Sequence, residues 1–251
     1  MAIALVTGTS SGLGLATAVS LARAGHTVTA TMRNLDGGAD LRQIIAKEKL
    51  PITLTAPDVD DDDSVHDAFA KVVAEHGWID ILVNNAGIPG AAGGVEEIPF
   101  NVFQQVMETN FFGALRCIKA VVPSMRERRK GTIVNITSLA GRIARASLAP
   151  YAASKWALEA LSECIAQEMR AFNVRVAIVE PGVIATPILT KRVSDSSGWS
   201  LSPCPADRGP LRRQARQSHP AVGCRRLDPR HRRWRQLAAS LPRRARRSAG
   251  A

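Results

Sequence analysis

Short apolar segments alternate with helical segments through the first three quarters of the chain. The apolar segments are rich in β-branched residues, a pattern typical of buried strands. They occupy residues 3–8, 27–32, 52–59, 79–87, 131–138 and 174–182. Because apolar strands joined by helices form parallel sheets covered on both faces, this alternation predicts a doubly wound, Rossmann-like α/β fold of three layers.

The segments between these strands repeat apolar residues at helical spacing. Helices are predicted over residues 14–24, 40–49, 63–76, 102–128 and 150–172. Pro123 lies inside the fourth helix, where its missing amide hydrogen predicts an interruption or an end. In a doubly wound fold, ligands bind at the carboxyl ends of the strands, so the residues that follow each strand are the candidates for a site.

The composition changes abruptly near residue 193. Residues 1–192 contain 19 basic and 19 acidic residues, whereas residues 193–251 contain 14 Arg, no Lys and 3 Asp, so the net charge of +11 belongs to this tail. The tail also lacks Ile, Phe, Tyr and Met, and it offers too little apolar surface to offset the entropy of ordering it. We therefore divide the chain into a domain at 1–192 and a basic, poorly ordered tail at 193–251.

Three origins of the tail are open. The leading hypothesis is a shifted reading frame (a frameshift product), because GC-rich DNA read out of frame encodes Arg, Pro and Ala. A disordered basic arm that touches RNA or an anionic membrane is the second, and a structured extension is the third. Because the charge of residues 1–192 is balanced, nucleic-acid binding is not expected of the domain itself.

The sequence predicts a cytoplasmic protein. No run of about 18 apolar residues is present, so no membrane span is expected. The first residues carry no basic region before the glycine-rich turn, which argues against a secretory signal. The 4 cysteines form no CxxC pair, which is typical of a cytosolic protein with free thiols.

A glycine-rich turn with the sequence TGTSSGLG follows the first predicted strand at residues 7–14. Its glycines would permit a tight turn and let backbone amides approach a pyrophosphate, and the following helix favours an anion at its amino end. The alternative is a turn that needs glycine for packing alone. The position at the first strand–helix crossover favours dinucleotide binding. The expected contacts are Thr7, Gly8, Ser10, Ser11, Gly12, Leu13 and Gly14.

Further motifs follow in a fixed order: NNAG at 84–87, Asn110, Ser138, YAASK at 151–155 and Pro-Gly at 181–182. Together with the TGxxxGxG spacing, they resemble the short-chain dehydrogenase/reductase family over residues 3–192. The resemblance implies an oxidoreductase that transfers a hydride between a nicotinamide dinucleotide and a small carbonyl or secondary alcohol substrate. Each motif alone is weak, but their joint order is highly specific.

Tyr151 and Lys155 are four residues apart in a predicted helix, so they share a face. A free phenol has a pKa of about 10, and a neighbouring ammonium lowers that pKa toward the range of a general base. Tyr151 is also the only tyrosine of the chain. The alternative is a structural tyrosine beside an exposed lysine, which the accompanying motifs disfavour.

Ser138 ends the fifth predicted strand and could hydrogen-bond a substrate oxygen. A solvated serine that begins a turn is the alternative, and Thr137 is an adjacent competitor; the resemblance selects Ser138. By the same resemblance, Tyr151 is the general acid and base, and Lys155 tunes it and binds the nicotinamide ribose. Asn110 would hold a water that relays protons to Lys155; its alternative is a helix residue bonded to nearby backbone.

The residues after the second strand bear on the choice of nucleotide. Members of the family that use NAD usually carry an acid there, whereas this chain has Met32 followed by Arg33. Because a guanidinium can pair with a 2′-phosphate, NADP is predicted. NAD is the alternative, since Arg33 could stack on adenine and Asp36 lies nearby. The further cofactor contacts that the resemblance implies are Arg33, Asp58, Val59, Asn85, Ala86, Gly87, Tyr151, Lys155, Pro181, Gly182, Val183 and Thr186.

The resemblance ends where the tail begins. Relatives continue with a substrate lid, further helices and a seventh strand, and residues 193–251 replace these parts here. Two other functions are therefore open: a cofactor-binding protein without turnover, and a nucleic-acid binder that acts through the tail. The run Ser-Leu-Ala-Gly-Arg at 138–142 and the MRN at 32–34 resemble relatives that act on steroid-like or other hydrophobic alcohols, which is an analogy alone, and the substrate itself is not readable.

Neither a metal ion nor a membrane is expected as a partner. No His, Cys and carboxylate cluster suggests a metal site, and the aspartates at 60–63 are interpreted as a solvated helix start. Members of the family pair through their long fourth and fifth helices, so the resemblance implies a homo-oligomer.

Overall fold

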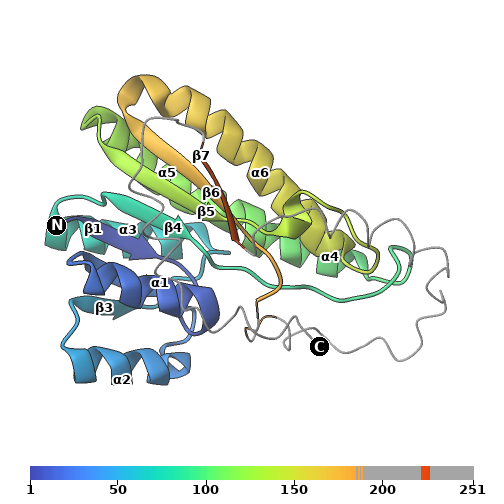
Figure 1. The fold of residues 1–251 in the computed structure, drawn as a ribbon, viewed down its shortest axis with the longest axis horizontal. Coiled ribbons are helices and arrows are strands. Elements are labelled where there is room, and N and C mark those ends of the chain that lie inside the picture. The colour runs from blue at the N-terminus through green and yellow to red at the C-terminus, as the bar shows by residue number, and fades with distance from the viewer. Residues whose placement is uncertain (185, 187, 189–221, 227–251) are drawn as a thin grey trace.

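The computed structural model describes residues 1–184, 186, 188 and 222–226. Its central feature is a 7-stranded sheet of order β3-β2-β1-β4-β5-β6-β7 (Figure 1). The strands are β1 (Ile3–Val6), β2 (Thr27–Thr31), β3 (Ile52–Thr55), β4 (Ile81–Asn84), β5 (Gly131–Ile136), β6 (Val174–Pro181) and β7 (Val222–Arg226). The strands β1 to β6 run parallel, so the predicted doubly wound fold is confirmed.

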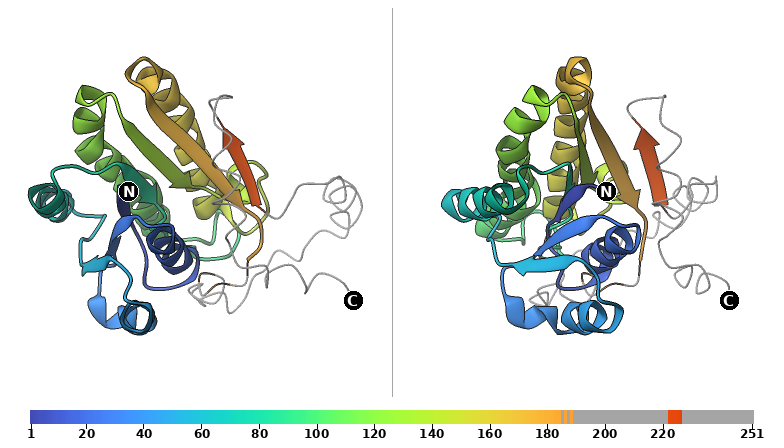
Figure 2. Two further views of the ribbon diagram at one scale, coloured as in Figure 1. Left: turned by 60° about the vertical axis from the view of Figure 1, so that its left-hand side comes forward. Right: turned by 90° about the vertical axis from the view of Figure 1, so that its left-hand side faces the viewer.

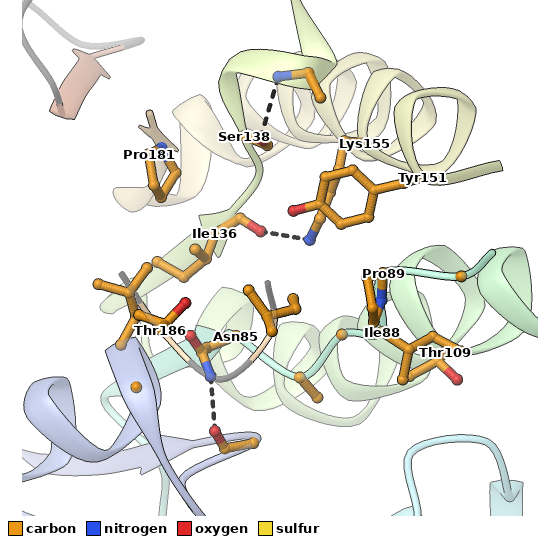
Figure 3. Close-up of a pocket in the computed structure, with 18 of the residues that line it drawn as sticks. Asn85, Ile88, Pro89, Thr109, Ile136, Ser138, Tyr151, Lys155, Pro181 and Thr186 are labelled. Atoms are coloured by element: carbon orange, nitrogen blue, oxygen red, sulfur yellow. Dashed lines mark hydrogen bonds between the residues drawn. The ribbon is translucent and has the colours of Figure 1, made fainter. Parts of the chain in front are cut away.

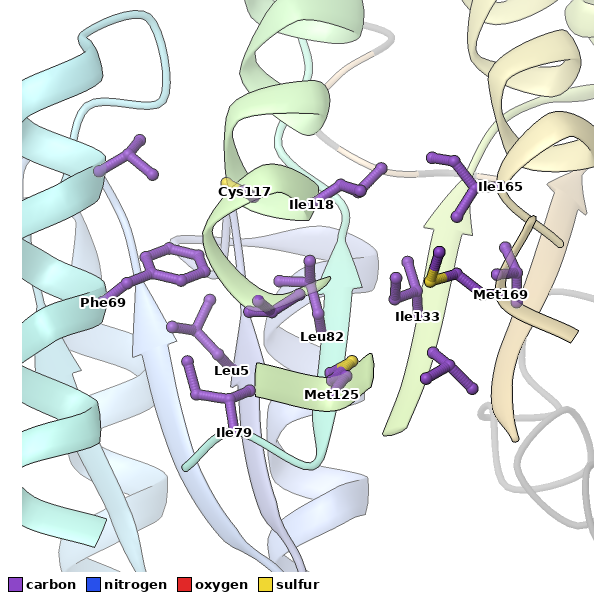
Figure 4. Packing of buried hydrophobic residues seen from close by; sticks show 14 of the residues in the cluster. Leu5, Phe69, Ile79, Leu82, Cys117, Ile118, Met125, Ile133, Ile165 and Met169 are labelled. Atoms are coloured by element: carbon purple, nitrogen blue, oxygen red, sulfur yellow. The ribbon is translucent and has the colours of Figure 1, made fainter. Parts of the chain in front are cut away.

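Helices cover both faces of the sheet (Figure 2). They are α1 (Gly12–Arg23), α2 (Ala39–Glu48), α3 (Asp62–His76), α4 (Phe100–Met107), α5 (Gly113–Glu127) and α6 (Ala149–Met169). Successive residues of β1 serve opposite faces. Leu5 belongs to the core formed with Phe69 of α3 and Ile118 of α5 (Figure 4), whereas Val6 belongs to the core formed with Leu21 of α1. Among the residues described, no helix is both long and apolar enough to cross a membrane.

The predicted helix 102–128 is divided in two. A π-helical turn, η2 (Glu108–Phe112), separates α4 from α5, and α5 continues through Pro123 to Glu127. The prediction that Pro123 interrupts or ends the helix is therefore wrong. Pro123 lies on an exposed face, where water can satisfy the carbonyl that loses its amide partner, so the helix tolerates the proline.

The strand β7 lies in the basic tail, where the sequence pattern predicted none. It pairs antiparallel with β6, with Val179 opposite Cys224. Pairing along a sheet edge uses backbone amides and carbonyls, so a segment without an apolar pattern can provide it. The prediction of poor order for the rest of residues 193–251 falls outside the described residues.

Asp80 anchors the amino-terminal edge of the sheet, just before β4. Its carboxylate accepts hydrogen bonds from the Ile3 amide at 3.1 Å and the Trp78 indole at 3.2 Å. Its Oδ1 lies 3.1 Å from an Arg128 nitrogen and 3.4 Å from Lys130 Nζ. Burial raises the pKa of Asp80, but these donors and cations outweigh burial and hold the pKa below its ordinary value.

We expect Asp80→Asn to lower the free energy of unfolding at neutral pH by about 2 kcal/mol, because hydrogen bonds to charged groups contribute roughly that much. Since the folded-state pKa is depressed, this contribution is present above the unfolded pKa of about 4 and is lost as the pH falls through the folded value. Urea unfolding from neutral to acid pH should show the two proteins converging in acid. Asp67→Asn, which removes an exposed carboxylate beside His66, is the control and should change little. Equal stability of Asp80→Asn and wild type at neutral pH would contradict the account.

Candidate active site

A cleft of about 1590 Å³ follows the carboxyl edge of the parallel strands. Sites for one small molecule usually enclose about 300–1000 Å³, so this cleft has room for a dinucleotide and a second molecule. The predicted site residues that line it are Gly8, Ser10, Ser11, Gly12, Leu13, Arg33, Val59, Asn85, Ala86, Gly87, Ser138, Tyr151, Lys155, Pro181, Gly182, Val183 and Thr186. The predicted residues that do not line it are Thr7, Gly14, Asp58 and Asn110.

The glycine loop forms one end of the cleft. Gly8 and Gly12 have φ values of +69° and +61°, a backbone region that favours glycine. The helix α1 begins at Gly12, the side chain of Ser11 makes no capping hydrogen bond, and the first turn contains no acidic residue. The amino end of α1 therefore presents uncapped amides and positive partial charge to the cleft, which fits the pyrophosphate of a dinucleotide.

Thr7 and Asn85 fasten the glycine loop to the end of β4. The Thr7 hydroxyl accepts hydrogen bonds from the amides of Asn85 and Ala86, both at 3.0 Å. In return, Asn85 Nδ2 donates to the carbonyls of Thr7 and Gly8, both at 2.9 Å. The side chain of Thr7 is buried, so the structure places it behind the loop as a support.

Arg33 follows β2 and lines the cleft together with its chain neighbours Met32 and Asn34. Its side chain is 55% exposed, and its Nη1 lies 3.8 Å from Asp60 Oδ2. An exposed guanidinium with one distant carboxylate is available to a phosphate. Nothing in this arrangement requires the arginine for packing.

The aspartates after β3 build a turn and a helix start. Asp58 Oδ1 accepts a hydrogen bond from the Asp60 amide at 3.1 Å, and the Asp58 amide donates to Ser64 Oγ at 3.0 Å. Asp61 is the N-cap of α3 and accepts from the Ser64 amide. This agrees with the interpretation of the aspartate run as a helix start. Val59, between them, faces the cleft.

Ser138, Tyr151 and Lys155 meet at the other end of the cleft (Figure 3). Tyr151 and Ser138 both line this end of the cleft, and Ser138 Oγ accepts a hydrogen bond from the Ala140 amide at 3.1 Å. Lys155 Nζ lies 5.7 Å from the centroid of the Tyr151 ring. Burial raises the pKa of Tyr151, and the nearby Ser138 side chain opposes that rise without cancelling it. In this structure the phenol is therefore held in its protonated form, and the expected lowering by Lys155 does not prevail.

Lys155 is buried beneath the tyrosine. Its Nζ donates to the Ile136 carbonyl at 2.9 Å, at the carboxyl end of β5 (Figure 3). Burial lowers the pKa of Lys155 to about 8, and the carboxylate of Glu159 opposes that fall. The ammonium therefore keeps its charge through neutral pH, close enough to its midpoint to respond to small changes around it.

Asn110 lies within the π-helical turn η2 and is buried. Its Oδ1 accepts from the Ile88 amide at 2.8 Å, and its Nδ2 donates to the Ile88 carbonyl and to Ser154 Oγ, both at 3.0 Å. The side chain of Asn110 therefore bonds to backbone, as the alternative interpretation predicts. The backbone is that of Ile88, which is 22 residues away along the chain and outside the helix. A methyl group on Gly87 would lie 3.2 Å from Asn110 Oδ1 and 3.7 Å from Lys155 Nζ, so both residues crowd the same turn.

The family model for short chain dehydrogenases matches residues 2–197. The chain belongs to the short-chain dehydrogenase family. The resemblance predicted from the motifs is thereby confirmed, and the match ends within a few residues of the change in composition near residue 193.

Three relatives illustrate the range of the family. The chain is 40% identical over 196 residues to the oxidoreductase YusZ of Bacillus subtilis, covering 77% of this chain and 69% of the relative. It is 42% identical over 187 residues to retinol dehydrogenase 8 of Bos taurus, covering 72% of this chain and 59% of the relative. An NADPH-dependent pterin aldehyde reductase of Arabidopsis thaliana is 37% identical over 199 residues, or 79% of this chain and 81% of that protein.

Solved structures of short-chain dehydrogenases contain both nicotinamide dinucleotides. A metagenomic short-chain oxidoreductase in complex with NADP matches with a TM-score of 0.69 and 34% identity, over 73% of this chain and 83% of that one. NAD⁺-bound xylitol dehydrogenase matches with a TM-score of 0.69 and 33% identity, over 72% and 70%. Family membership therefore implies a nicotinamide dinucleotide without deciding between the two.

The lining of this dehydrogenase's cleft is more apolar than polar. Among the lining residues that the sequence analysis did not single out, Ile88, Pro89, Val102, Ile143, Leu148 and Ile188 are apolar, and Gln105, Thr109 and Arg145 are polar or charged. No motif marks these positions. Val102 belongs to α4, and the other apolar residues named lie outside regular helices and strands, where apolar residues have no periodicity that separates them from core residues. Thr186 also lines the cleft, and its hydroxyl donates to the Ile184 carbonyl at 3.4 Å.

In the described residues, no group of three or more His, Cys, Asp or Glu could hold a metal ion.

Proposed function

We propose that this short-chain dehydrogenase transfers a hydride between NADP(H) and a carbonyl or secondary alcohol. The observation that carries the proposal is that Tyr151, Ser138 and the buried Lys155 line the same cleft as the glycine loop. A nucleotide held by that loop could reach the tyrosine along one continuous surface. This is the arrangement that a hydride transfer with one proton donor requires.

The residues of the chain fit such a nucleotide. The amides at the start of α1 would hold the pyrophosphate, Val59 would contact the adenine, and Arg33 would meet a 2′-phosphate. Pro181, Gly182, Val183 and Thr186 would border the nicotinamide end. When bound, the nicotinamide would supply or accept the hydride.

The proton chemistry belongs to the side chains. In the reductive direction, Ser138 would hold the substrate oxygen while Tyr151, protonated because burial raises its pKa, would donate the proton. Lys155 would stabilise the phenolate that results, since its ammonium lies beside the ring. In the oxidative direction, the same phenolate would accept the proton.

The substrate should be apolar on the side away from its carbonyl. The lining of the cleft includes the apolar residues Ile88, Val102, Ile143 and Leu148, which would bury a hydrocarbon portion. The match to retinol dehydrogenase 8 supports an apolar alcohol or aldehyde as the class to test first.

Arg33 should decide the choice of nucleotide. We expect Arg33→Ser to raise the Kd for NADPH by about 10- to 100-fold, because a charge-assisted pair with phosphate contributes about 1.5–3 kcal/mol, and to leave the Kd for NADH nearly unchanged. Arg42→Ser removes the same charge from α2, where the side chain donates to the Leu35 carbonyl, and should spare both affinities. Fluorescence titration of both nucleotides measures this. Equal losses for NADPH and NADH would argue against a 2′-phosphate contact.

The proposed function is tested by combining NADPH binding with turnover. Oxidation of NADPH with apolar aldehydes and ketones would support hydride transfer. The second candidate is binding of the nucleotide without turnover, which is favoured by the end of the family match at residue 197. Tight NADPH binding with no reduction of any carbonyl in the panel would select this second function, and no binding would overturn both.

A further inference from the structure

Arg142 ties three elements together behind the site. It follows the short 3₁₀ turn η3 (Leu139–Gly141), four residues after Ser138. Its Nε lies 2.9 Å from Glu180 Oε1 on β6, and its Nη2 lies 2.7 Å from Glu159 Oε2 and 3.3 Å from Glu163 Oε1 on α6. One guanidinium thus joins the loop that carries Ser138 to the helix that carries Tyr151 and Lys155.

Glu159 is the buried member of this group. It lies one helical turn after Lys155 on α6, and the residue is 3% exposed. Burial raises the pKa of Glu159, while the Thr137 hydroxyl and the Arg142 guanidinium oppose that rise. A buried carboxylate is costly without a cation, so the position of Arg142 and the charge of Glu159 depend on each other.

The backbone of the η3 turn packs directly on α6 at the same place. A methyl group on Gly141 would lie 3.1 Å from the Lys155 carbonyl oxygen and 3.2 Å from Glu159 Cγ. The absence of a side chain lets the loop approach the helix at these two residues. The ion pair between Arg142 and Glu159 joins the same turn to the same helix beside this contact.

We propose that Arg142 and Glu159 are a positioning pair for the reaction, which holds Ser138 against Tyr151 and keeps a carboxylate one turn from Lys155. The inference rests on the proposed function for its kinetic part. Neither residue lines the cleft or touches the reacting atoms. The charged and titratable groups around Lys155 are Tyr151 and Glu159 on its own helix, with Arg142 and Glu180 acting through Glu159.

The kinetic test uses Glu159→Gln, Arg142→Ala and Arg142→Lys. We expect the first two to lower kcat about 10- to 100-fold, because a small misplacement of reacting groups costs up to about 100-fold, with KM and the Kd for NADPH near wild type. Arg142→Lys keeps the positive charge but lacks the several N–H donors of a guanidinium, so its kcat should lie between those of Arg142→Ala and the wild type.

The control variants are Arg23→Ala and Glu48→Gln. They break an ion pair of 2.6 Å between α1 and α2 and should leave kcat unchanged. Unchanged kcat in folded Glu159→Gln and Arg142→Ala would overturn the proposal.

A second readout needs no turnover. Nuclear magnetic resonance of isotope-labelled lysine side chains would follow the titration of Lys155, whose pKa in the wild type is about 8. Because the Glu159 carboxylate raises that pKa, Glu159→Gln should move the titration to lower pH, and the alkaline limb of kcat should move the same way. If the wild type proves inactive, the titration alone tests the proposal, and an unchanged pKa of Lys155 in Glu159→Gln would overturn it. If Glu159→Gln does not fold, the kinetic test rests on Arg142→Lys, and a kcat equal to that of the wild type in this variant would contradict the proposal.

Discussion

Tyr151→Phe should lower kcat for NADPH-dependent carbonyl reduction by about 100- to 10,000-fold, the range that general acid–base catalysis contributes. The substitution removes the hydroxyl and keeps the ring, and Lys155 keeps its hydrogen bond to the Ile136 carbonyl at 2.9 Å. The glycine loop lies at the other end of the cleft, so the Kd for NADPH should stay nearly unchanged. Steady-state NADPH oxidation and fluorescence titration measure the two quantities. Undiminished turnover in the variant would remove Tyr151 from the mechanism.

The single tyrosine of the chain makes a companion measurement selective. Tyrosinate absorbance in an alkaline titration reports Tyr151 alone. In the nucleotide-free protein the pKa of Tyr151 should lie above the ordinary value of about 10, because burial outweighs the opposing effect of the Ser138 side chain. Ser138→Ala should raise the pKa further, since it removes the interaction that lowers it. A fall of that pKa on adding NADP⁺ would show the nucleotide acting on the phenol.

Local spacing was enough to predict part of the site. Tyr151 and Lys155 share a face because they are one turn apart in a helix. The fold is predicted in the same way, since apolar strands joined by helices allow few arrangements. These two inferences need only the backbone geometry of regular elements, whereas the choice of Ser138 over Thr137 needs the resemblance to the family.

Other parts of the site depend on contacts that no local pattern records. The bonds between Thr7 and Asn85 join residues 78 apart, and Lys155 is held by a backbone carbonyl that any residue at 136 would provide. The pairing of Arg142 with Glu159 depends on the depth at which α6 packs, which turns one glutamate among several on that helix into a buried one. Pro123 is a similar case. The sequence predicts that it interrupts or ends the helix, because the local pattern does not show that Pro123 lies on an exposed face of α5, where the helix tolerates it.

The tail is the part of the chain for which the sequence predicts the least about structure. The change of composition near residue 193 and the end of the family match at residue 197 nearly coincide. The strand β7 shows that basic sequence can still pair with the edge of the sheet. The encoding DNA separates the hypotheses: a one-base shift near codons 190–200 that restores an apolar strand and helices would establish a shifted frame, and its absence would leave a genuine basic extension.

Gly14→Ala should lower both the stability of the protein and its affinity for the nucleotide, although Gly14 lies behind the cleft and not in its lining. A methyl group there would overlap the Gly8 carbonyl oxygen and Asn85 Nδ2, which are fixed by the hydrogen bond between them at 2.9 Å. Because these are backbone atoms and a bonded amide, neither can move aside cheaply. Overpacking of this kind costs about 1–3 kcal/mol and sometimes more, and we expect the upper end.

The matched control is Gly93→Ala, where a methyl group would lie 3.5 Å from its nearest neighbours in Glu97 and Ile98. That distance is ordinary van der Waals contact, so the control should unfold in urea at nearly the same midpoint as the wild type. Gly14→Ala should unfold at a lower midpoint and bind NADPH at least about 10-fold more weakly, because shifting the glycine loop removes the amides at the start of α1 from the pyrophosphate. A Gly14→Ala protein that loses stability but binds NADPH normally would place the pyrophosphate elsewhere, since the loop cannot accommodate the methyl group and keep its shape.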